Sequence, residues 1–217
     1  SNEFYQLWLD ETMTYSCGFF KNKNTTMKEA SIEKLDRLCR KLDLRQEDSI
    51  LEIGTGWGAL AIYAAENYGC RVTTTTISKE QFDYAKQRVR ENGLEHLVEV
   101  LDRDYRELPG RYDKIVSIEM IEAVGDEYMN VFFRKCRSLL KPDGIMLLQS
   151  ILMNDRDYED YLESVDFIRF YVFPGGCLPS MKRIDAINNE EKLFDRVNSL
   201  DMTASYVQTL RFWIESF

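Results

Sequence analysis

The sequence predicts an α/β fold in which helices cover a doubly wound, mostly parallel sheet. Three observations predict it. Between residues 49 and 151, short apolar or β-branched segments alternate with amphipathic ones, as in the βα units of parallel sheets. A glycine-rich turn directly follows the first apolar segment, and an aromatic-rich stretch interrupts the alternation after the fifth. We therefore expect a single domain over 1–217, with an N-terminal helical segment at 1–45 and a helical cap inserted at 152–185.

Each expected strand is a short run of apolar or β-branched residues, and these runs lie at 49–53, 71–77, 97–101, 114–118 and 145–151. Each expected helix has apolar residues at helical spacing, and these lie at 26–42, 59–68, 79–92, 127–140 and 204–216. Lys141-Pro142-Asp143-Gly144 closes the helix before the last of these strands. A further strand is expected within 192–200. Sheets of this kind often finish with a terminal hairpin, and because one of its strands is missing here, we expect the protein to be a fragment.

The helix at 26–42 has an apolar face, and Lys34 is among the basic residues assigned to its solvated side. Two interpretations stay open for this helix. It either packs on the sheet as an ordinary surface helix or faces a membrane.

Composition and charge argue against several function classes. The sequence has 37 acidic against 28 basic residues and a net charge of −9, which disfavours nucleic acid as a partner and gives no long-range attraction to anionic lipid. No apolar run is long enough to span a bilayer. The five cysteines are scattered without a CxxC pair, so neither a disulfide framework nor a metal site is indicated, and a reducing cytoplasm is the expected location.

The stretch YSCG (15–18) places a cysteine, Cys17, near the start of the sequence. A cysteine in this setting can be a nucleophile, a metal ligand or a thiol with no chemistry. A Cys–His nucleophilic pair would need His96, the single histidine, to fold back onto Cys17. The sequence therefore disfavours a catalytic thiol.

The glycine-rich turn LEIGTGWG (51–58) lies between the first strand of the sheet and the helix that follows it. Its GxGxG spacing differs from the GxGxxG of dinucleotide-binding sheets. The second strand ends in threonines, where a nicotinamide enzyme would place an acid for the ribose hydroxyls. A nicotinamide cofactor is therefore disfavoured, and the turn resembles the S-adenosylmethionine loop of class I methyltransferases. Asp104 and Tyr105, after the third strand, are placed to hold an adenine.

Seven blocks run in order along nearly the whole sequence: FYQLWLDETMTYSCGFF (4–20), LEIGTGWGALAIYAAE (51–66), VTTTTISKEQ (72–81), IVSIEMIEAVG (115–125), LLQSI (147–151), YVFPGGCLPS (171–180) and SYVQTLRFW (205–213). Together they resemble the cyclopropane-fatty-acyl-phospholipid synthase and mycolic acid cyclopropane synthase family of S-adenosylmethionine-dependent methyltransferases. FPGGCLPS and YSCG are hardly shared by unrelated methyltransferases. The resemblance implies a class I methyltransferase (Rossmann-like) fold with a helical cap after strand five.

The resemblance also implies the site residues. In that family a bicarbonate ion beside the methyl donor acts as general base. The contacts to bicarbonate carry over to the backbone N–H of Cys17 and to Glu122, Gln149, Ile151 and Tyr206. The S-adenosylmethionine site carries over to residues near the glycine turn and the strand ends: Tyr15, Ser16, Gly54, Gly56, Thr76, Ile77, Gln81 and Tyr105.

The implied reaction transfers a methylene group from S-adenosylmethionine to the double bond of an unsaturated fatty acyl group of a phospholipid. A cyclopropane ring forms through a carbocation, which aromatic faces such as Tyr171, Phe173 and Tyr206 would stabilise. The expected setting is cytoplasmic with peripheral membrane contact and no nucleic acid, and assembly into a homo-oligomer stays open.

Two residues depart from the commonest family pattern, since Ala123 and Gln149 stand where many members have histidine. An amide at Gln149 still donates a hydrogen bond. The Glu-Ala-Val-Gly form occurs among relatives that cyclopropanate and among relatives that methylate a fatty acyl group. The alternatives are therefore a C-methyltransferase that leaves a methyl branch on the acyl group, a methyltransferase acting on a small amine, or a catalytically silent lipid- or cofactor-binding module. Taken without the resemblance, Glu122 could be a helix cap and Tyr206 ordinary helix packing.

Overall fold

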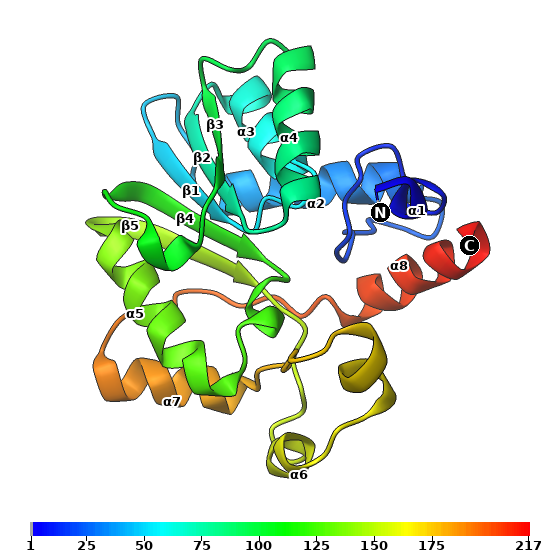
Figure 1. Ribbon diagram of the computed structural model, residues 1–217, viewed down its shortest axis with the longest axis vertical. Helices are drawn as coiled ribbons and strands as arrows, with labels where there is room; N and C mark the ends of the chain where they lie inside the picture. Colours follow the sequence, from blue (N-terminus) through cyan, green and yellow to red (C-terminus); the bar gives the residue numbers. More distant parts are fainter. Residues whose placement is uncertain (1) are drawn as a thin grey trace.

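Five parallel strands form one sheet, in the order β3-β2-β1-β4-β5 (Figure 1). The computed structural model describes residues 2–217. Its strands are β1 (Ser49–Ile53), β2 (Arg71–Thr76), β3 (Val98–Asp102), β4 (Tyr112–Ile118) and β5 (Leu140–Gln149). The polypeptide adds β2 and β3 on one side of β1 and then returns to add β4 and β5 on the other. The doubly wound prediction is confirmed, and the switch in strand order lies between β1 and β4.

Helices cover both faces of this sheet (Figure 1). One layer consists of α2 (Met27–Lys41), α3 (Ala59–Tyr68) and α4 (Lys79–Glu91), and the other of α5 (Met129–Leu139) and α7 (Met181–Glu191). Successive strand residues point to opposite faces, so Ile50 packs in the first core and its neighbour Leu51 in the second. The continuous apolar strands of the sequence therefore supply both cores.

The two ends of the polypeptide lie side by side (Figure 1). They carry the short helix α1 (Asn2–Gln6) and the last helix α8 (Thr203–Ser216). The rings of Trp8 and Trp213 meet at 5.4 Å between centroids, and the backbone N–H of Gly18 donates to Thr209 Oγ1 at 3.0 Å. The N-terminal segment and α8, which are distant in sequence, thus pack against each other.

The helical cap expected after the fifth strand is present as α6 (Tyr158–Glu163) and a π-helical turn (Ile168–Val172). Because α7 begins at Met181 and packs on α5, the expected insertion at 152–185 runs into the helical layer of the sheet. Short 3-10 turns complete the fold at Tyr105–Glu107, Ile121–Ala123 and Asp126–Tyr128. Within residues 2–217, no helix combines the length and hydropathy needed to traverse a bilayer.

The strand expected within 192–200 is wrong. This segment runs without regular structure from α7 to α8, and the side chains of Val197 and Leu200 are 89% and 43% exposed. A strand needs a neighbour that satisfies its backbone and covers one face, and in the described sheet no strand lies beyond β5. The turn expected at 141–144 lies inside β5 instead, as a bulge where the register against β4 shifts.

Candidate active site

The glycine turn lies at the carboxyl ends of β1 and β2, beside the switch in strand order. The N–H groups of Gly54 and Thr55 donate to the Thr75 carbonyl at 3.0 and 3.1 Å, which ties the turn to β2. Gly54 and Gly56 have φ angles of +100° and +52°, which favour glycine. A Cβ added to Gly56 would meet no atom within 4 Å, so its backbone faces open space. Open α/β sheets bind ligands at this point, and the bare turn fits S-adenosylmethionine.

Other residues assigned to the cofactor lie along the neighbouring strand ends. Thr76 Oγ1 donates to Gln81 Oε1 at 3.0 Å, and the side chain of Ile77 is 78% exposed. The Asp104 carboxylate caps the following 3-10 turn and pairs with an arginine of that turn. Tyr105 is half-buried against the core beneath α5. These residues border the same edge of the sheet as the glycine turn, and their contacts with the cofactor stay predictions.

The segment Tyr15–Gly18 is held between two helices. The Tyr15 ring packs against Trp213 of α8 with centroids 5.3 Å apart. Ser16 Oγ accepts a hydrogen bond from Lys34 Nζ of α2 at 2.7 Å. These contacts fix the backbone of the segment on both sides.

The environment of the Cys17 thiol does not suit a nucleophile. It is 1% exposed, and its Sγ donates to the Gly18 carbonyl at 3.2 Å. Burial raises the pKa of the Cys17 thiol to about 12, and the negative charge of Glu119 adds to the shift. Because the thiolate is the nucleophilic form, a thiol kept protonated is a weak nucleophile. What Cys17 offers is its backbone N–H, which donates to Glu119 Oε1 at 2.9 Å.

Glu119 receives hydrogen bonds from three separate parts of the molecule. Besides Cys17, the Gln149 amide donates to Oε1 at 2.8 Å and the Tyr206 phenol donates to Oε2 at 3.1 Å. The φ angle of Glu119 is +46°, a conformation uncommon for a residue with a Cβ. Glu119 is not among the residues predicted from the sequence, although its place directly after the expected strand at 114–118 was a signal that could have found it.

Glu122 has a different setting. Its Oε1 accepts from the backbone N–H of Ile151 at 2.6 Å and from Ser150 Oγ at 2.9 Å. Its Oε2 is buried and has no hydrogen-bond partner among residues 2–217. Burial raises the pKa of Glu122, its hydrogen bonds oppose that shift, and the nearby charge of Glu119 adds to it. The structure thus gathers two carboxylates at the end of β4, in unlike environments.

The residues assigned to bicarbonate do gather here, but they bind carboxylates of the protein. Cys17, Gln149 and Tyr206 donate to Glu119, and Ile151 donates to Glu122. A bicarbonate ion between the first three would have to displace the Glu119 side chain. The residues present therefore do not fit bicarbonate at this position.

Two buried ionisable groups, Lys34 and Glu52, lie near these residues. The Lys34 side chain is 2% exposed, so its assignment to a solvated helix side is wrong: the segment 14–18 covers it. Burial lowers the pKa of Lys34 to about 8, and Glu119 is first among the negative groups that oppose the shift. Burial likewise raises the pKa of Glu52 to about 8, although its carboxylate accepts from Thr74 Oγ1 at 2.6 Å.

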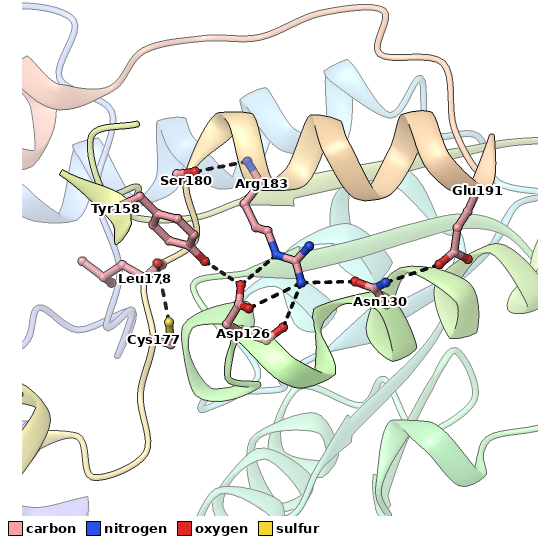
Figure 2. Close-up of polar contacts among 8 residues, drawn as sticks. All are labelled: Asp126, Asn130, Tyr158, Cys177, Leu178, Ser180, Arg183 and Glu191. Atoms are coloured by element: carbon pink, nitrogen blue, oxygen red, sulfur yellow. Dashed lines mark hydrogen bonds and ion pairs between the residues drawn. The ribbon is translucent and has the colours of Figure 1, made fainter. Parts of the chain in front are cut away.

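The FPGGCLPS turn holds the backbone of Glu122, because the Cys177 N–H donates to the Glu122 carbonyl at 2.7 Å. Figure 2 shows how this turn is anchored. The Tyr158 phenol and Arg183 Nε both donate to Asp126 Oδ1, at 2.7 and 2.8 Å, which joins the cap to α7 and to the start of α5. The cap and the candidate site are thereby one connected structure.

Comparisons with known proteins agree with this fold. The family model described as mycolic acid cyclopropane synthetase matches residues 1–217. The protein is 39% identical over 219 residues to a probable fatty acid methyltransferase of Pseudomonas putida, covering 100% of this sequence and 55% of that protein. It is 38% identical over 216 residues to the cyclopropane-fatty-acyl-phospholipid synthase of Escherichia coli K12, covering 100% of this sequence and 54% of that one. It thus spans about half the length of these curated relatives.

Among solved structures, the mycolic acid cyclopropane synthase CmaA1 in complex with SAH and CTAB superposes with a TM-score of 0.91. The two sequences are 31% identical, and the match covers 100% of this protein and 79% of that one. The class I methyltransferase fold expected from the sequence is confirmed.

Proposed function

The chain belongs to the mycolic acid cyclopropane synthetase family, and on that premise we propose that it transfers a one-carbon unit from S-adenosylmethionine to the double bond of an unsaturated fatty acyl group. Ring closure to a cyclopropane on a phospholipid is the outcome we propose first. The observation that carries the proposal is the meeting of Glu119, Glu122 and Tyr206 beside the glycine turn. The segment after β4 lies close to the glycine turn, since a Cβ added to Gly54 would lie 3.1 Å from Met120 Cβ.

S-adenosylmethionine supplies an electrophilic methyl group, and SAH is what remains after its transfer. The glycine turn and the end of β2 form the place for this donor, because the backbone at Gly56 is unobstructed. An isolated alkene is a poor nucleophile, so rigid placement of donor and alkene is the main requirement. Segments fastened at several points, such as Tyr15–Gly18, meet that requirement.

Methyl transfer leaves a positive charge on the acyl group. The carboxylates of Glu119 and Glu122 and the face of Tyr206 suit that charge, since anions and aromatic rings both attract cations. The bicarbonate ion implied by the family resemblance has no part in this scheme. Three of the groups that would donate hydrogen bonds to it already donate to Glu119.

An apolar surface on the cap supports an acyl substrate and peripheral membrane contact. Apolar side chains of the cap are half or more exposed at Val165, Phe167, Ile168, Phe170, Tyr171 and Val172. The net charge of −9 gives no electrostatic attraction to anionic lipid, so contact would rest on these apolar groups.

A second candidate is methylation of a fatty acyl group without ring closure, favoured by the 39% identity to a probable fatty acid methyltransferase. The hydrogen-bond network around Glu119 argues against the silent binding module. Gln149, one of the two departures from the family pattern, donates to Glu119 at 2.8 Å and so belongs to a connected network.

Mass spectrometry of lipids from cells expressing the protein tests the proposal. A mass gain of one CH₂ in an acyl group that has no double bond left to hydrogenate indicates a ring. A gain of one CH₂ with a double bond retained means a methyl or methylene branch. Tight S-adenosylmethionine binding with unchanged lipids, in cells rich in unsaturated phospholipid, would contradict both outcomes and support the silent module.

A further inference from the structure

We propose that Glu119 is the general base of the reaction, a carboxylate built into the protein in the place that the family resemblance assigns to a bicarbonate ion. This inference rests on the proposed function. It assigns Glu119 a role in the reaction, and it predicts that turnover does not depend on bicarbonate.

The hydrogen bonds around Glu119 carry the inference. A backbone N–H, a side-chain amide and a phenol, from Cys17, Gln149 and Tyr206, all point at one carboxylate. They come from the N-terminal segment, the end of β5 and α8, so local backbone geometry alone does not explain their meeting. Three convergent donors form a binding site for a planar oxyanion, and the Glu119 carboxylate fills it.

The backbone of Glu119 supports the same conclusion. A φ of +46° costs free energy for a residue with a Cβ, and such strain is concentrated at functional sites. Here the strain has a visible result, because the carboxylate reaches all three donors. The neighbouring carboxylate of Glu122 is held by Ile151 and Ser150 instead and does not compete for them.

The three donors leave part of the Glu119 carboxylate free. A carboxylate has about four lone-pair positions. Two donors occupy Oε1 and one occupies Oε2. The charged groups that influence this region are the ammonium of Lys34 and the carboxylate of Glu122, of opposite sign, and Lys34 Nζ donates to Ser16 rather than to Glu119. The carboxylate thus keeps the electron pair that proton abstraction needs.

The alkene π pair forms a bond to the methyl carbon of S-adenosylmethionine, the C–S pair stays on sulfur, and SAH leaves. A cation remains on the other alkene carbon. Glu119 takes a proton from the added methyl group, and the released C–H pair forms the second C–C bond that closes the ring. Glu119 ends as a neutral carboxylic acid and returns its proton to solvent before the next turnover.

The test begins with bicarbonate itself. The full-length protein is assayed on unsaturated phospholipid vesicles with S-adenosylmethionine, in carbonate-free buffer and with added bicarbonate. Wild-type turnover is expected to be the same in both. Glu119→Gly, chosen because glycine tolerates the positive φ, is expected to lose roughly 10²–10⁴-fold in kcat and to regain part of it with bicarbonate or formate.

Two further variants sharpen the test. Glu119→Gln fills the same space without a base, so it is expected to be as slow as Glu119→Gly but not rescued by added anion, with KM for S-adenosylmethionine unchanged. Glu127→Gln, an exposed acid nearby, serves as the matched control and is expected to keep wild-type turnover.

Binding of isotope-labelled bicarbonate, followed by carbon NMR, gives a readout that needs no turnover. Wild type is expected to bind none at this site and Glu119→Gly to bind it. Bicarbonate binding by wild type, bicarbonate-dependent wild-type turnover, or a fully active Glu119→Gln would overturn the inference. A wild type that modifies no lipid yet shows the expected binding pattern would overturn the proposed function and the role of base, while leaving Glu119 as the occupant of the anion site.

Discussion

The phenol of Tyr206 donates to Glu119 Oε2 at 3.1 Å, across 87 positions of sequence, and so joins the last helix to the end of β4. Burial raises the pKa of Tyr206, and the negative charge of Glu119 adds to that shift. The phenol therefore stays protonated at every working pH and acts as a permanent donor. Helix α8 is in this way part of the candidate site and not only packing.

Tyr206→Phe removes one hydrogen bond to a charged group and keeps the ring against Trp213. We expect a loss of roughly 1–3 kcal/mol in transition-state stabilisation, or about five- to 150-fold in kcat. Steady-state kinetics on phospholipid vesicles measure this. Tyr128→Phe, at an exposed position, is the matched control, and equal effects of the two variants would contradict a role for the Tyr206 phenol.

Glu122→Gln keeps the shape of the residue but removes its negative charge. The Oε2 atom of Glu122 is buried and has no hydrogen-bond partner among residues 2–217. Because that charge faces the developing cation in the proposed reaction, we expect kcat to fall by about 10²–10³-fold. S-adenosylmethionine binding, measured by calorimetry, is expected to stay near the wild-type value. Retained turnover would remove Glu122 from the mechanism, and lost binding would show that its role lies in the fold.

The sequence predicted the elements whose signals are local. SILEI is apolar on both faces and ends at glycines, so β1 was placed at 49–53, as found. The strand expected within 192–200 failed because a strand requires a neighbouring strand, and pairing is not a local property. Lys34 was misplaced for the same kind of reason. Its own helix suggested a solvated position, but the distant segment around Ser16 buries it.

The candidate site was predicted through family resemblance, and its chemistry only in part. Cys17, Gln149 and Tyr206 do converge, as the resemblance implied, but on Glu119. No pattern in the sequence states that a glutamate after β4 adopts a φ of +46° and turns its carboxylate toward them. That fact depends on three tertiary contacts at once.

Glu52 is expected to make stability depend on pH. Burial raises the pKa of its carboxyl from 4.5 to about 8. Between these values the folded protein holds a proton that the unfolded protein has lost, so the free energy of unfolding falls as pH rises from about 4.5 to about 8. In Glu52→Gln the titrating group is gone while an oxygen still accepts from Thr74.

Urea denaturation at about pH 5 and about pH 8 measures this dependence. We expect the free energy of unfolding to fall less over that range in Glu52→Gln than in wild type. Glu66→Gln, at an exposed position, is the control and is expected to follow wild type. An identical pH slope in Glu52→Gln would mean that Glu52 titrates near its ordinary pKa in the folded protein.

The cysteines are expected to be silent toward thiol reagents while the protein is folded. All five are buried and free, and burial raises the pKa of Cys17 to about 12, so at neutral pH almost no thiolate exists to react. Titration with Ellman's reagent should find no rapidly reacting thiol in the native protein and all five after unfolding in urea. A thiol-specific alkylating agent should likewise leave turnover unchanged. One fast native thiol that maps to Cys17, with turnover lost on its modification, would restore the nucleophile interpretation of Cys17.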